Sequence, residues 1–185
     1  MITEYIDVIS TDNIINEKIM FNLWKEGWDK SENINCDGID WRNLNWKKAK
    51  FIVNENKTEI EQINNKAGGI YMIVCEPNIH FLHKYILYIG RARITKNQNL
   101  RKRCKEYYND YLKYKNSSLG EITISNRPKV NKMLHVYAPY LSIYYCELGN
   151  NKIIDDLEKI LIALILPPCN KELPGKLNRA VSAAF

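Results

Sequence analysis

The sequence predicts a small α/β domain with a central three-stranded, mostly antiparallel sheet flanked by helices, preceded by an N-terminal extension. Two observations lead to this fold class. Three apolar segments of strand length, 70–75, 85–89 and 141–148, are rich in β-branched and aromatic residues. Between and after them, apolar residues recur at helical spacing over 99–114 and 151–166. A chain of 185 residues is long enough to bury the core of such a domain.

The first 65 residues are rich in Asn, Lys and Glu, and we interpret them as an extension to a domain that spans 66–185. The extension contains all four tryptophans, Trp24, Trp28, Trp41 and Trp46. A short helix is expected over 16–26. Thr58 is expected to cap a second, brief helix over 59–63.

In the domain itself, the strands over 70–75 and 85–89 are expected to form a hairpin. The helix over 99–114 should bury one apolar stripe against the sheet. Its members are Leu100, Cys104, Tyr107, Tyr108 and Tyr111. A short helix is expected over 130–137, before the third strand. The last helix should end at Pro167 and Pro168, because proline cannot continue a helix.

Composition excludes several classes of protein. With 45% hydrophobic and 26% charged residues, the chain is typical of globular proteins. Its longest apolar run, 160–166, is far short of the ~20 residues that a membrane span needs. The N-terminus has acidic residues where a secretory signal has basic ones, so we expect a cytoplasmic protein without a membrane partner. The five cysteines are scattered and form no Cys-x-x-Cys pair, which predicts reduced packing residues.

Positive charge is concentrated in one segment. The chain carries a net charge of +6 at pH 7, but residues 84–115 hold ten lysines and arginines against two acids. This segment is therefore +8 and the remainder of the chain is −2. Such a footprint is typical of proteins that bind a polyanion, most often nucleic acid. A solvated helix face is the alternative interpretation.

Three side chains in these elements are candidates for chemistry. On a helical wheel, Glu158 falls on the apolar face of the last helix, and Asp155 and Asp156 fall on the opposite face. A carboxylate among isoleucines needs a cation, a metal or hydrogen-bond donors. Glu158 is therefore either a helix-edge residue paired with an arginine, or a metal ligand or acid–base group. Arg103 and Tyr107, four residues apart, point the same way, either to bind phosphate or to pack as a stacked pair.

These residues occur in an order that resembles the GIY-YIG nuclease family. Gly69-Ile70-Tyr71 and Tyr88-Ile89-Gly90 resemble the two tripeptides that name the family. Arg91-Ala92, the run Asn99 to Arg103, and Tyr107 are similar to the excision-repair branch, in which tyrosine replaces the histidine of homing enzymes. Glu158 and Asn170 resemble the family's glutamate helix and its trailing asparagine. The resemblance covers 66–171, with a longer hairpin and an insertion over 94–98 as departures.

The resemblance implies hydrolysis of phosphodiester bonds. Glu158 would be the only protein ligand of a Mg²⁺ or Mn²⁺ ion, which otherwise holds water and phosphate oxygens. Arg103 would bind the scissile phosphate. Among the tyrosines, Tyr71 is the favoured base, with Tyr88 and Tyr107 orienting water and phosphate.

Other residues would support these roles. Gly90 would let the backbone approach the phosphate, and Asn170 would be a structural tie for the glutamate helix. The side chains expected to bind nucleic acid, beside Gly90, are Arg91, Arg93, Lys96, Arg101, Lys102 and Lys105. His80 and His83 have a spacing that zinc could use, but no further ligand completes a site. His135 is expected to be a packed or exposed residue.

The sequence therefore predicts a metal-dependent DNA endonuclease, of a restriction or defence type. The alternatives are a non-catalytic nucleic-acid-binding module and an RNase. Residues 1–65 are expected to serve recognition or dimerisation, and a homodimer would suit a palindromic target.

Overall fold

The computed structural model describes residues 40–54, 57–77 and 83–170. The helix expected over 16–26, with Trp24 and Trp28, lies outside the described residues. In the part of the chain that is described, no helix is both long and apolar enough to cross a membrane.

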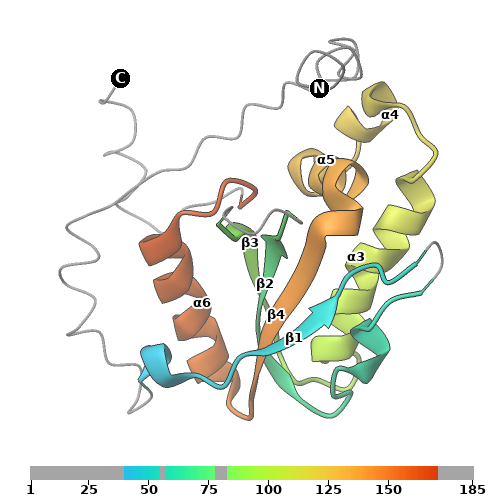
Figure 1. The fold of residues 1–185 in the computed structure, drawn as a ribbon. Coiled ribbons are helices and arrows are strands. Elements are labelled where there is room, and N and C mark those ends of the chain that lie inside the picture. The colour runs from blue at the N-terminus through green and yellow to red at the C-terminus, as the bar shows by residue number, and fades with distance from the viewer. Residues whose placement is uncertain (1–39, 55–56, 78–82, 171–185) are drawn as a thin grey trace, which may run out of the picture.

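The centre of the molecule is one antiparallel sheet of four strands, in the order β1-β4-β2-β3 (Figure 1). The strands are β1 (Lys47–Lys50), β2 (Gly68–Cys75), β3 (Tyr85–Ala92) and β4 (Leu141–Leu148). The three strands expected from the sequence are present. The sheet nevertheless has a fourth, so the predicted number was wrong.

The extra strand, β1, comes from the stretch that we interpreted as an extension. Its sequence, Lys-Lys-Ala-Lys, has no apolar alternation, and only Ala49 is buried. β1 nevertheless pairs with β4 over its whole length. Ile60 and Ile63 are also fully buried in the same core as Tyr71. The core therefore reaches across the boundary expected after residue 65.

The helices lie on both faces of the sheet. Their bounds are α3 (Leu100–Tyr114), α4 (Leu119–Thr123), α5 (Pro128–Tyr137) and α6 (Asn151–Ile165). Figure 1 shows α3 and α5 on one side and α6 on the other. Short 3₁₀ turns occur at η3 (Trp41–Asn43), η4 (Ile60–Gln62) and η5 (Ala138–Tyr140). The brief helix expected near residue 59 is the turn η4, whose first N–H donates to the Thr58 hydroxyl (3.2 Å).

Helix ends follow from local polar residues. The Asn99 side chain accepts a hydrogen bond from the Lys102 N–H (2.9 Å) and so caps α3. Asn150 caps α6 in the same way, through the N–H groups of Lys152 and Ile153. Leu166 ends α6 in the left-handed conformation, with φ at 51°, immediately before the two prolines.

β2 is an interior strand of the sheet and is buried on both faces. Alternate side chains point to opposite sides of a strand. Ile70, Met72 and Val74 consequently pack in the cluster with α6, and Tyr71 and Ile73 pack in the cluster with α3. This alternation carries Tyr71 to the α3 side of the sheet.

Gly69, at the start of β2, occupies a position that only glycine fits. Its φ is 157°, and a Cβ there would overlap the carbonyl oxygen of Cys146 on β4. The close approach of β2 and β4 therefore explains the first glycine of the Gly69-Ile70-Tyr71 tripeptide.

Candidate active site

Three tyrosines from three different elements meet on the α3 side of the sheet. Tyr71 lies on β2, Tyr88 on β3 and Tyr107 on α3, and their ring centroids are 5.7 to 6.3 Å apart. The hydroxyl oxygens of Tyr71 and Tyr107 are 2.8 Å apart and share a hydrogen bond. Tyr88 pairs in register with Ile73, so Tyr71 and Tyr88 are diagonal neighbours across the hairpin.

Arg103 reaches this cluster from α3. It lies one turn before Tyr107, and its Nε donates to the Tyr71 hydroxyl (3.2 Å). Its guanidinium carbon also stands 5.7 Å from the centre of the Tyr107 ring. On its outer side, Arg103 forms an ion pair with Glu106, which in turn accepts from the Gln98 amide (2.7 Å). The arrangement holds a half-buried positive charge beside two phenols.

Gly90 makes room for Tyr71. The two residues are direct partners in the β2–β3 register, and a Cβ at position 90 would overlap the phenol of Tyr71 and the edge of the Tyr88 ring. The expected reason for this glycine was close approach of a phosphate. The structure supplies another reason, because the space beside Gly90 is filled by the tyrosine of the other tripeptide.

Burial determines the protonation state of the inner tyrosines. Tyr71 and Tyr107 are fully buried. Loss of solvation raises the pKa of Tyr71 well above its usual range, and it raises the pKa of Tyr107 as well, although the charge of Arg103 opposes both shifts. Burial thus favours the neutral phenol at Tyr71, and its expected role as the base stays a prediction. Tyr88 is only partly buried and is the member of the cluster with access to solvent.

Glu158 lies on α6, beside the edge strand β3, and is bound by Arg91 from that strand. Burial raises the pKa of Glu158, and the charges of Arg91 and Arg103 act in the opposite direction. The charge of Arg103 reaches Glu158, although α3 and α6 lie on opposite faces of the sheet, with the edge strand β3 beside both. Of the two interpretations of Glu158, pairing with an arginine is the one that this structure contains.

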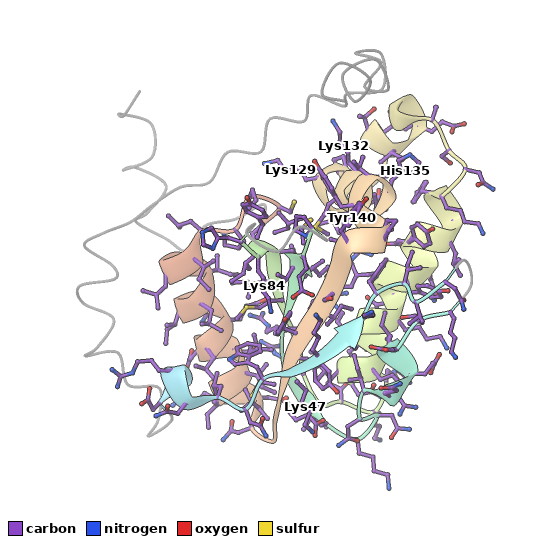
Figure 2. All side chains as sticks on the ribbon, in the orientation of Figure 1. Lys47, Lys84, Lys129, Lys132, His135 and Tyr140 are labelled. Carbon is purple, nitrogen blue, oxygen red and sulfur yellow. The ribbon has the colours of Figure 1, made fainter. Side chains whose placement is uncertain are left out.

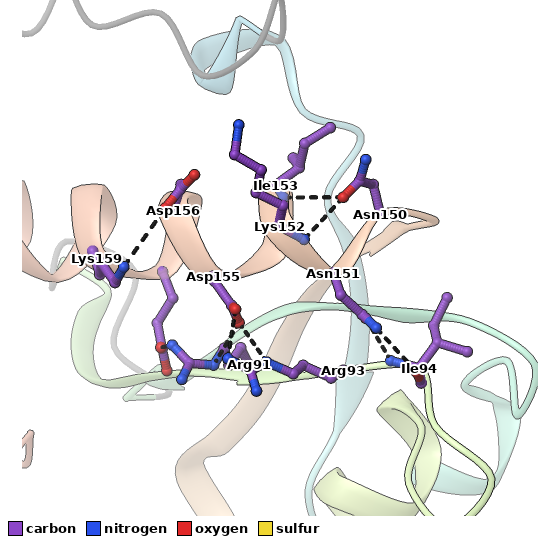
Figure 3. Close-up of polar contacts among 11 residues, drawn as sticks. Arg91, Arg93, Ile94, Asn150, Asn151, Lys152, Ile153, Asp155, Asp156 and Lys159 are labelled. Atoms are coloured by element: carbon purple, nitrogen blue, oxygen red, sulfur yellow. Dashed lines mark hydrogen bonds and ion pairs between the residues drawn. The ribbon is translucent and has the colours of Figure 1, made fainter.

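Asp155 also belongs to this site, contrary to the prediction that placed it on the opposite face. Its carboxylate accepts from Arg91 Nε (3.0 Å) and from Arg93 Nε (2.8 Å), as Figure 3 shows. Asp155 and Glu158 are three residues apart and so lie one above the other on α6. That spacing was the signal that could have revealed the pair. Asp156 instead points away and forms only a loose, exposed ion pair with Lys159 (3.6 Å).

Two asparagines attach the two ends of α6 to the edge strand β3 and to the residues that follow it. At the start of the helix, the Asn151 side chain accepts from the Ile94 N–H (2.8 Å) and donates to its carbonyl (3.1 Å) (Figure 3). Beyond its end, the Asn170 side chain makes the same two-point contact with Ile89 (3.0 and 2.8 Å). Asn170 therefore holds the chain after α6 against β3, and the glutamate helix is fixed relative to the strand that carries Arg91.

The donor set suits magnesium better than zinc. No group of three or more His, Cys, Asp or Glu that could hold a metal occurs within the described residues. Glu158 and the adjacent Asp155 are two carboxylates on one helix face, and Mg²⁺ is commonly held by one or two carboxylates with water and phosphate oxygens completing its shell. His83 is exposed, and its expected zinc partner His80 lies outside the described residues.

The predicted basic residues do not form one continuous track. Arg101 donates to the carbonyl of Ile63, and Lys105 pairs with Glu61, so both face η4. Residues two apart on a helix are separated by about 200°, which places them away from Arg103. Lys96 and Lys102 are exposed.

Further cations lie on α5, outside the basic segment identified in the sequence. Figure 2 shows Lys129, Lys132 and His135 on this helix, near the point where Tyr140 leads into β4. The His135 ring contacts the carbonyl of Tyr114 through Nδ1 (3.2 Å), so it packs against the end of α3.

Sequence reasoning missed one residue of the tyrosine cluster entirely. Arg127, just before α5, places its guanidinium carbon 5.0 Å from the centre of the Tyr107 ring and forms an ion pair with Asp110. Tyr107 is thus contacted by two arginines, Arg103 and Arg127. No local sequence pattern predicts this contact, because α5 packs against α3 only in the folded protein.

No protein-family model, curated protein or solved structure matched the chain. Its function is therefore inferred from the geometry of the site.

Proposed function

We propose that this protein is a metal-dependent endonuclease of the GIY-YIG type that hydrolyses phosphodiester bonds in DNA. The observation that carries the proposal is the hydrogen bond from Arg103 Nε to the Tyr71 hydroxyl, which itself bonds Tyr107. A partly buried guanidinium held by a buried phenol is a fixed, positively charged donor suited to a phosphate. The carboxylate of Glu158 lies within electrostatic range of the same arginine.

Arg103 binds the scissile phosphate in this mechanism. Its guanidinium cannot lose its proton at any working pH, so its charge is available as negative charge develops on the phosphate oxygens. Tyr71 and Tyr107 are fully buried neutral phenols that hold Arg103 in place from the core side, and burial raises the pKa of both. Glu106 and Gln98 hold the outer side of Arg103 and so orient its free edge.

Tyr88 is the side chain that handles the proton of the attacking water. It contacts the rings of Tyr71 and Tyr107 and is partly exposed, so water can reach it. A general base must lie within hydrogen-bond reach of the water that it activates. This role replaces the one first expected for Tyr71, which is fully buried.

Glu158, with Asp155 beside it, would hold the Mg²⁺ or Mn²⁺ ion. A bound ion would stabilise negative charge on the transferring phosphate and lower the pKa of its water. In the free protein Arg91 neutralises Glu158. Substrate phosphates offer Arg91 a second acceptor, which would release the carboxylate at the moment when DNA is present.

One observation favours a second candidate, a nucleic-acid-binding module without catalysis. The carboxylate of Glu158 is already satisfied by Arg91, and such a pair is also a stable structural arrangement. In that case Arg91 would stay on Glu158, and the basic side chains would bind nucleic acid without cutting it.

The deciding experiment incubates DNA and RNA of one sequence with the full chain, with Mg²⁺ or with EDTA. Wild type should cut DNA only when the metal is present, and Glu158→Ala should bind DNA at least as tightly but not cut it. Asp156→Ala is the matched control, because this acid lies on the same helix and points away from the site. Binding without cutting, equal in wild type and Glu158→Ala, would support the second candidate. Cutting of RNA alone would show that the substrate is RNA and not DNA.

A further inference from the structure

A cavity of about 490 Å³ lies between the end of α3, the helix α4 and the start of α5, where Figure 1 shows these three elements meeting. We call it the α4–α5 pocket. It is lined, among others, by Asp110, Lys113, Tyr114, Ile124, Arg127 and Asn131. Ligand sites of small organic molecules have volumes of this order. None of the roles proposed above uses this cavity.

One residue that lines the α4–α5 pocket, Asn131, carries an unpartnered hydrogen-bond acceptor. Asn131 is only 5% exposed, and its Nδ2 donates to the Ser125 hydroxyl (2.9 Å). Its Oδ1 is the one buried side-chain oxygen or nitrogen without a hydrogen-bond partner among the residues that the structure describes. Leaving a buried acceptor unsatisfied costs about 1–3 kcal/mol. A ligand with an N–H or O–H donor would recover that cost.

The walls of the pocket combine apolar surface with charge. Ile124 is 87% exposed, an unusual position for an isoleucine, and it lies at the pocket. Tyr114 presents a ring, over which Lys113 Nζ stands at 4.9 Å from the centroid. A flat group could pack between such surfaces. The carboxylates of Asp110 and Glu121, also in the lining, disfavour an anion in the interior.

The pocket is one side chain away from the candidate phosphate site. Arg127 lines it and contacts the Tyr107 ring (5.0 Å), and Arg103 contacts the same ring (5.7 Å). The ring of Tyr107 therefore separates the arginine of the pocket from the arginine of the tyrosine cluster. A nucleotide next to a phosphate held by Arg103 would meet the α4–α5 pocket.

We propose that the α4–α5 pocket binds the base of an unpaired nucleotide of the substrate. The base would stack against Tyr114 and Ile124, and one of its N–H donors would bond Asn131 Oδ1. Lys113 and Arg127 would face the neighbouring phosphates. Its place beside the scissile bond rests on the proposed nuclease function, but the binding of a base does not.

The test titrates the full chain, without metal, with 5′-mononucleotides carrying each of the four bases, and follows backbone amide signals by NMR. Ribose 5-phosphate is the base-free control ligand. At least one nucleotide should shift the signals of Ile124 and Asn131, and ribose 5-phosphate should not. Equal shifts with ribose 5-phosphate would mean a phosphate site and would overturn the proposal.

Two substitutions make the test specific to the pocket. Asn131→Leu removes the acceptor and Ile124→Ser removes the apolar wall, and each should weaken nucleotide binding about tenfold or more. Ile124→Ser changes an almost fully exposed side chain, so it stays informative if Asn131→Leu does not fold. Val53→Ser, at another exposed apolar position that does not line the pocket, should bind as wild type does. Wild-type binding by both pocket variants would overturn the proposal.

Failure of this inference is distinguishable from failure of the nuclease function. Nucleotide binding at the pocket, in a chain that cuts no nucleic acid, would contradict the nuclease function and support the proposed base site. Metal-dependent cutting, with no effect of nucleotides on the signals of Ile124 or Asn131, would contradict the proposed base site and support the nuclease function.

Discussion

Gly90 and Tyr71 face each other across the β2–β3 ladder, and the phenol of Tyr71 occupies the space that any side chain at position 90 would need. From there Tyr71 reaches Tyr107 and Arg103. The last glycine of one tripeptide and the tyrosine of the other are thus a single packing unit. Absence of a Cβ on the edge strand is what brings the tyrosine hydroxyl to the arginine.

Gly90→Ala should therefore disturb both stability and the site. Its methyl would overlap a fully buried ring, and overpacking of this kind costs about 1–3 kcal/mol. We expect a lower denaturant midpoint and a loss of cleavage rate larger than the loss of DNA affinity. Gly149→Ala is the matched control, since nothing lies within 4 Å of a Cβ at that position. Equal effects of the two substitutions on stability and cleavage rate would show that the packing of Tyr71 against Gly90 does not matter for function.

Asp155→Ala should lower the cleavage rate by about tenfold, because Arg91 and Arg93 lose their shared acceptor and small displacements at a reacting centre are costly. Asp156→Ala, one residue further and exposed, should stay within about twofold of wild type. Single-turnover rates of the two variants measure the difference. Equal rates would show that Arg91 does not need Asp155.

Tyr88→Phe and Tyr71→Phe should differ in their effect on the cleavage rate. If Tyr88 accepts the proton of water, its loss should cost about 10²- to 10⁴-fold in rate. Tyr71→Phe loses its hydrogen bonds to Tyr107 and Arg103 but keeps Tyr88, so it should cost less. Single-turnover rates of the two variants measure the difference. A larger loss in Tyr71→Phe than in Tyr88→Phe would return the base role to Tyr71.

Glu76 should make the free energy of unfolding depend on pH. Burial opposes its charge, but hydrogen bonds from Lys48, Ser142 and Tyr144 prevail and lower the pKa of Glu76 to about 2, from 4.5. A carboxyl whose folded-state pKa is depressed stabilises the fold above its unfolded pKa. That contribution, on the order of 1–2 kcal/mol for this largely buried group, should fade as pH falls from about 4.5 to about 2.

Denaturant unfolding of wild type and Glu76→Gln at several pH values measures this contribution. The two curves should be separated at neutral pH and converge in acid. A gap that stays constant with pH would mean that the hydrogen bonds act without the charge.

Lys102→Ala and Lys105→Ala should differ in DNA binding, because Lys105 is ion-paired with Glu61 and Lys102 contacts a backbone carbonyl. Lys102 is exposed and its charge is available to phosphates, so its removal should flatten the dependence of log K on log[salt] by about one unit. Lys105 is held by Glu61, and its removal should leave the slope nearly unchanged. The original expectation gave Lys105 and Arg101 the same role as Lys102. Equal slopes for the two variants would restore it.

Much of the fold could be predicted from local pattern. The strands β2, β3 and β4 and the helices α3 and α6 follow from the periodicity of their apolar residues, and Asn99 caps α3 as its position before the apolar stripe implies. The same periodicity brings Arg103 and Tyr107 to one side of α3, because residues four apart share a helix face. These features depend on neighbours in the chain, which a sequence displays directly.

Tertiary structure alone decided the rest. β1 joins the sheet through backbone hydrogen bonds, which leave no mark in its lysine-rich sequence. Asp155 meets Arg91, and Arg127 meets Tyr107, across elements that no period relates. The sequence by itself thus determined which side chains share an element face. Packing decided which faces meet. It therefore decided that Gly90 leaves room for the ring of Tyr71 and that Tyr71 is fully buried, because overlap and desolvation depend on everything that surrounds a side chain.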